Sequence, residues 1–205
     1  MKVELINSLV SSVLNIILFV LIPFSIYYAR QRRKYGTGLK ELCARAGLVI
    51  GPVRYLVFSL VVAVFAATLI VLVPPDINGL THGKSGQSAF VGLGVSGLSI
   101  SMAAIYGFLK TGFCEEFFFR GLIGGAFARR MSLWWANLCQ ALIFLLPHLM
   151  IIWFAPQLWY LLIAVFVAGL IAGWIRIRSG SILGPVLLHG SMNFTTCMVV
   201  VAHTT

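Results

Sequence analysis

Two adjacent glutamates and an arginine lie inside one of the most apolar stretches of this chain, the segment Phe113–Gly121 (FCEEFFFRG). The whole chain has only five acidic residues, and Glu115 and Glu116 are two of them. A charged side chain at the centre of a membrane helix costs about 2.5–3.5 kcal/mol. The segment is therefore compatible only with a fold in which these groups face a bundle interior or a wet cavity, and it marks a candidate functional site.

The composition indicates a membrane protein. Hydrophobic residues make up 60% of the 205 positions and charged residues 10%, whereas a soluble domain carries about 25% charged residues. We therefore predict an all-α fold, a polytopic transmembrane helical bundle in an integral membrane protein. The four cysteines have no CxxC spacing, which argues against a zinc ribbon and against a disulfide framework.

The basic residues are concentrated beside apolar segments. The net charge is +10, and seven of the fifteen basic residues fall between Arg30 and Arg54. This bias follows the positive-inside rule, so we expect residues 30–54 to form a cytoplasmic loop near anionic lipid headgroups. Nucleic acid is not an expected partner.

Six apolar segments are long enough to cross a bilayer as helices. They cover residues 6–29, 55–73, 97–127, 133–154, 158–175 and 182–202. Two crossings within residues 89–130 would give seven spans, but a single long helix keeps Arg129 and Arg176 on the cytoplasmic side. We predict six spans, with seven as the alternative, arranged as two units: residues 1–88, with two spans, and residues 89–205, a motif-bearing membrane core.

Small residues recur four positions apart at Gly121 and Gly125, and again at Gly169 and Gly173. Such pairs allow close helix approach in membranes. We expect them to pack within one chain rather than between two, which favours a monomer.

Two later spans carry polar side chains at helical spacing. Phe144 and His148 are four residues apart, as are His189 and Asn193, so each pair shares one helix face. Pro147 directly precedes His148 and predicts a kink or break in that helix. Several costly polar groups on separate spans are hard to explain by folding alone, and we expect them to meet in one water-accessible cavity.

The two glutamates point in different directions on a helix. Glu116 and Arg120 are four residues apart and can neutralise each other, whereas Glu115 lies about 100° around the helix from Glu116. Glu115 is thus free to act with an imidazole as a base toward water. A second imidazole and a carboxamide can stabilise a developing oxyanion. The set suits hydrolysis of an amide without a covalent intermediate.

The patterns Glu-Glu-x-x-x-Arg, Phe-x-x-x-His and His-x-x-x-Asn resemble, in order, the motifs of the CPBP intramembrane proteases, also called the Abi or CAAX-protease family. The resemblance covers residues 97–200 and implies a glutamic-type endopeptidase. It implies catalytic roles for Glu115 as general base, His148 as its assistant, and His189 and Asn193 as oxyanion hole, with structural support from Glu116, Arg120 and Phe144.

The resemblance also implies a membrane-anchored protein or peptide as substrate. The client could be of the CAAX type, a peptide undergoing maturation or a C-terminal anchor tail that is removed. The compact chain favours a prokaryotic cytoplasmic membrane. We expect no cofactor.

Two alternatives stay open. A zinc protease could use Glu115, His148 and His189 as ligands, although there is no HExxH motif and Asn193 is a poor zinc ligand. A membrane immunity or scaffold protein could keep the fold without catalysis. A cysteine protease based on Cys114 and a proton-coupled transporter, which would usually show repeat symmetry, are less favoured.

Overall fold

Five long apolar helices run along the bundle in the computed structural model, which describes residues 2–81 and 85–204. Each is long and apolar enough to cross a membrane. They cover Leu5–Tyr35, Val53–Leu72, Leu133–Phe154, Tyr160–Ser179 and Leu183–His203. The described residues form no β-strand. The predicted all-α membrane bundle is thus confirmed, and these five helices match five of the six predicted spans.

The segment between Gly97 and Ala128 is one continuous helix, as predicted for a single crossing. It comprises α6 (Gly97–Ala104), η3 (Ile105–Phe113), η4 (Glu116–Gly124) and α7 (Gly125–Ala128). Both η3 and η4 are π-helical, so their turns are wider than α-helical turns. The helix carries four charged residues and is not among the five apolar candidates. The count of six spans therefore stays a prediction.

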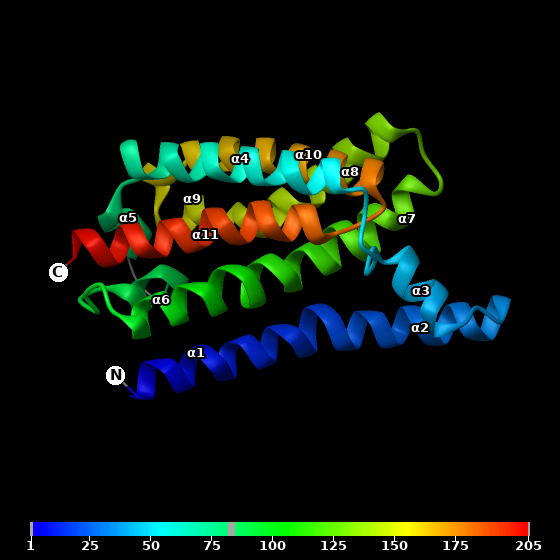
Figure 1. The fold of residues 1–205 in the computed structure, drawn as a ribbon, viewed down its shortest axis with the longest axis horizontal. Helices are drawn as coiled ribbons and strands as arrows, with labels where there is room; N and C mark the ends of the chain where they lie inside the picture. Colours follow the sequence, from blue (N-terminus) through cyan, green and yellow to red (C-terminus); the bar gives the residue numbers. More distant parts are fainter. Residues whose placement is uncertain (1, 82–84, 205) are drawn as a thin grey trace.

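This central helix lies between the N-terminal helix and α11 (Leu183–His203), as Figure 1 shows. The N-terminal helix is continuous through α1 (Lys2–Asn15), η1 (Ile16–Leu21) and α2 (Ile22–Tyr35). On the other side, α11 packs against both η3 and α4 (Val53–Leu72). The α8 helix (Leu133–His148) packs against α10 (Tyr160–Ser179). The charged central helix thus lies inside the bundle, with helices on both sides of it (Figure 1).

Short elements close the two ends of the bundle. The α3 helix (Leu39–Arg45) lies beside α2 and α7 at the end away from both termini (Figure 1). The remaining short elements are α5 (Ile77–Thr81), η2 (Gly86–Phe90), α9 (Met150–Phe154) and η5 (Pro156–Leu158). Figure 1 shows α5 at the opposite end from α3.

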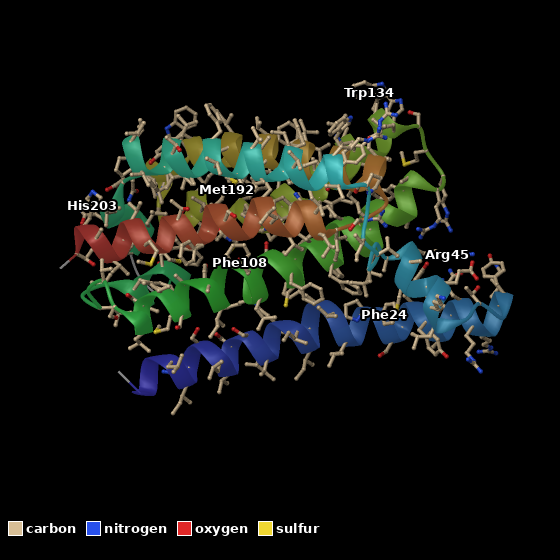
Figure 2. All side chains as sticks on the ribbon, in the orientation of Figure 1. Phe24, Arg45, Phe108, Trp134, Met192 and His203 are labelled. Carbon is tan, nitrogen blue, oxygen red and sulfur yellow. The ribbon has the colours of Figure 1, made fainter. Side chains whose placement is uncertain are left out.

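Basic segments that are far apart in sequence meet at one end. Arg129 Nη1 and Arg176 Nη2 donate hydrogen bonds to the carbonyl oxygen of Arg45, at 3.5 and 2.8 Å. Figure 2 shows Arg45 and His203 at opposite ends of the bundle. The residues predicted to be cytoplasmic are therefore gathered on one side, as a single crossing by the central helix requires.

The predicted glycine pairs do permit close approach within the chain. A Cβ atom on Gly121 would lie 2.6 Å from the carbonyl oxygen of Ala46, just after α3. A Cβ on Gly173 would collide with the side chains of Asn137 and Gln140 on α8. These glycines join α3 to the central helix and α10 to α8, and larger residues would force the elements apart.

We predict that cysteine labelling will report one crossing by the central helix. In a background without the four native cysteines, Lys34→Cys and Met131→Cys should be labelled from the cytoplasmic side because both lie at the basic end. Asn78→Cys should be labelled from the outside. Labelling of Met131→Cys from the outside would show instead that residues 89–130 cross twice.

Candidate active site

A buried ionic cluster links the central helix to α11. One oxygen of Glu116, Oε1, lies 3.0 Å from Arg120 Nη1 and accepts a hydrogen bond from His189 Nδ1 at 2.8 Å. The side chains of Glu116 and Arg120 are each 1% exposed. The ion pair predicted from the four-residue spacing therefore forms. Its contact with His189 was not anticipated.

The ion pair leaves polar atoms unsatisfied. Arg120 Nη1 is within ion-pair distance of Glu116 Oε1, but it has no hydrogen bond of acceptable geometry, so their attraction is mainly one of charge. Glu116 Oε2 and Arg120 Nε also have no hydrogen-bond partner among the described residues. Buried polar atoms of this kind are commonly hydrated, so the cluster suits a site that admits water.

Glu115 has a different environment from its neighbour. Its side chain is half-buried, and it makes no hydrogen bond or ion pair with any residue that the structure describes. It lies within electrostatic range of His189 and Arg120. One carboxylate is thus held by an arginine and a histidine, while the adjacent carboxylate is unpaired at the same site.

The Phe144 ring is the point at which the motif helices meet. Arg120 Cζ lies 3.8 Å from the centre of this ring, which is a close cation–π contact. The ring centres of His148 and His189 lie 4.6 and 5.9 Å from that of Phe144. Side chains from α8, α11 and the central helix are therefore brought together around one aromatic ring.

His148 ends α8 with a defined orientation. Its Nδ1 lies 2.8 Å from the carbonyl oxygen of Phe144. Because a carbonyl only accepts, Nδ1 carries the proton and Nε2 of the neutral ring is an acceptor. Leu149 interrupts the helix before α9 begins at Met150, as Pro147 predicted. No direct hydrogen bond joins His148 to Glu115, and a bridge through one water stays a prediction.

Asn193 is held by the central helix. Its Nδ2 donates to Thr111 Oγ1 at 2.8 Å. The Thr111 hydroxyl is within hydrogen-bond distance of the carbonyl oxygens of Tyr106 and Gly107, at 2.9 and 3.1 Å. Because the single hydroxyl hydrogen is donated to the backbone, the Thr111 oxygen can only accept a hydrogen bond from Asn193. Thr111 therefore fixes which end of the Asn193 amide faces it.

Residues 97–195 match the family model described as type II CAAX prenyl endopeptidase, Rce1-like. No curated protein and no solved structure matches the chain. Residues 97–195 thus form an Rce1-like domain of the CAAX endopeptidase family. Its members are peptide hydrolases, and a membrane-anchored peptide is the substrate class that the family implies. The matched range lies inside the predicted unit 89–205 and contains all seven predicted site residues.

Three glycines let α11 approach the central helix, and the sequence analysis did not identify them as packing positions. A Cβ on Gly107 would lie 2.6 Å from the carbonyl oxygen of Gly190. A Cβ on Gly112 would lie 3.2 Å from the Cα of Gly190. This proximity of backbones allows Asn193 to reach Thr111 and His189 to reach Glu116. In the sequence, these small residues lie in the same spans as the polar motif residues, and that pattern could have indicated the close approach.

Asn137 and Gln140 support the site from α8 and were also missed. Gln140 Nε2 donates to the carbonyl oxygen of Gly169 at 2.9 Å, and Asn137 Nδ2 donates to that of Leu170 at 3.0 Å. Both side chains are buried. They fasten α8 to α10 and so help to position Phe144 one turn further along. Two amides three residues apart in an apolar span could have suggested this role.

The described residues contain no group of three or more His, Cys, Asp or Glu side chains that could hold a metal ion. Glu115, His148 and His189, the ligands of the alternative zinc site, do not form such a group. Cys114 is a free thiol with a fully buried side chain, which also gives the thiol alternative no support.

We predict strong coupling between Glu116 and Arg120 in stability measurements. Glu116→Gln should cost about 3–5 kcal/mol of unfolding free energy because it leaves a buried guanidinium without its carboxylate. Arg120→Met should be destabilising for the converse reason. The double variant should lose much less than the sum of the two, as measured by reversible unfolding in micelles. Additive losses would show that the pair contributes no interaction energy.

Proposed function

We propose that the chain is an intramembrane endopeptidase in which Glu115 activates the attacking water. The observation that carries the proposal is the difference between two adjacent carboxylates. Glu116 is held by Arg120 and His189, whereas Glu115 is unpaired and partly exposed. An unpaired carboxylate is available to accept a proton, and a carboxylate already shared by two donors is not.

Glu115 and His148 would hold the water between them. In the proposed step, Glu115 takes one proton from the water. At the same time the water oxygen forms a bond to the carbonyl carbon of the substrate. Nε2 of His148 accepts a hydrogen bond from the other water proton and orients the attack. The peptide C–N bond then breaks, and Glu115 returns the proton to the leaving nitrogen, which restores the carboxylate.

His189 and Asn193 would stabilise the tetrahedral oxyanion. One N–H of the Asn193 amide is engaged by Thr111, and its second N–H remains to donate to substrate. Nε2 of His189 can donate when the ring carries both protons, and Glu116 compensates that positive charge through Nδ1. Donors that are positioned before the reaction stabilise charge without reorganisation during it.

The client is proposed from the family. A prenylated CAAX protein is the substrate that the family description names, and peptide maturation and removal of anchor tails are the other candidate reactions. Phe119 packs edge-on against both Phe144 and Phe118, and these bulky rings beside the cluster favour an apolar chain segment next to the scissile bond. We place the enzyme in a prokaryotic cytoplasmic membrane.

Glu115→Gln should reduce turnover by at least about 100-fold, in the range by which general acid–base groups accelerate reactions. The protein should keep its thermal stability because Glu115 makes no pairing contact. Turnover is measured in proteoliposomes with quenched peptides, with and without a prenyl group. Asp76→Asn, an equivalent change at an exposed position far from the site, is the matched control. Wild-type turnover by Glu115→Gln would refute the assignment.

Exhaustive chelation should leave turnover unchanged, because the proposed steps need only protein side chains and water. The measurement compares chelated and untreated enzyme and includes elemental analysis for zinc. Loss of activity on chelation, reversed by added Zn²⁺, would favour the zinc mechanism instead.

A further inference from the structure

A large cleft opens at the basic end of the bundle, away from the catalytic cluster. Its volume is about 1270 Å³. Its walls come from α2 and the turn that follows, from α3, and from the last turns of the central helix. Figure 1 shows these three elements side by side at the end opposite both termini. The cleft therefore lies between the N-terminal segment and the helix that carries Glu115.

The lining of the cleft is strongly basic. One acidic residue lines it, Glu41, and its carboxylate forms an ion pair with Arg45 four residues later. The hydrogen bond that Arg45 donates to this carboxylate raises the pKa of Arg45. The basic residues lining the cleft are Arg30, Arg33, Lys34, Arg45, Arg129 and Arg130. With Arg45 neutralised by Glu41, five positive charges face the cleft without a carboxylate partner among the described residues.

The lining of the cleft also has an apolar part, which precedes the basic residues along α2 and along the central helix. Its lining includes Pro23 and Ile26 from α2 and Leu122, Ile123 and Phe127 from the central helix. Along both segments the lining thus passes from hydrocarbon to positive charge. Such a lining suits a soluble peptide or a free inorganic ion less well than an amphipathic molecule. Its chemistry matches a molecule that has an anionic head and an apolar tail.

We propose that this cleft binds one anionic glycerophospholipid. The phosphate would lie among the arginines of α2 and of the segment after α7, where guanidinium groups form charge-assisted hydrogen bonds. The acyl chains would lie along Ile26 and Leu122. This is a defined site between two segments, distinct from the general attraction of basic loops to a charged membrane surface. The bound lipid would tie the N-terminal helix to the catalytic helix.

The test compares two double variants of the full-length protein in micelles by native mass spectrometry. Arg33→Gln/Arg130→Gln removes two charges from the cleft, one from each wall. Arg54→Gln/Arg178→Gln removes two exposed charges that do not line the cleft. Each delipidated protein is titrated with phosphatidylglycerol and, separately, with phosphatidylcholine. Thermal unfolding without lipid verifies that both variants are folded.

The wild type should retain one phosphatidylglycerol in preference to phosphatidylcholine. The cleft variant should bind it about 25-fold more weakly, since each basic side chain contributes about a factor of five near anionic lipid. The control variant should bind as the wild type does. Equal losses in both variants, or equal retention of the two lipids, would overturn the proposal. Displacement of the lipid by excess inorganic phosphate would also overturn it, in favour of a free-anion site.

Discussion

The buried contact of Glu116 with Arg120 and His189 is the interaction on which the site depends. A glutamate and an arginine in the core of a membrane bundle cannot each be left alone, because an uncompensated charge there costs several kcal/mol. Their pairing allows the central helix to lie between the N-terminal helix and α11. The histidine from α11 then joins the pair, so the same contact that neutralises charge also connects two helices.

Close packing makes that contact geometrically possible. Gly107 and Gly112 on the central helix and Gly190 on α11 let the two backbones approach without intervening side chains. The wide π-helical turns on both sides of Glu115 belong to the same region, and such turns are frequent at functional sites. Phe144 completes the arrangement by covering the Arg120 guanidinium with its ring.

Features that repeat along one helix could be predicted from the sequence, and contacts between helices could not. The apolar spans, the single continuous helix over residues 97–128 and the Glu116–Arg120 pair all follow from composition, from the bias of basic residues or from four-residue spacing. The contacts of His189 with Glu116 and of Asn193 with Thr111 depend on the rotation and depth of α11 relative to the central helix. No local sequence pattern determines this rotation or this depth. Glycines like those that set them also occur in membrane helices that carry no functional site.

The division of roles between Glu115 and Glu116 can be tested by modification with a hydrophobic carbodiimide, which reacts with unpaired carboxyl groups in apolar surroundings. Peptide mapping of the modified protein identifies which glutamate carries the adduct while turnover is followed in parallel. The account predicts one adduct at Glu115, inactivation in proportion to it, and no reaction at Glu116. Modification of Glu116 with Glu115 untouched, or full activity with Glu115 fully modified, would contradict it.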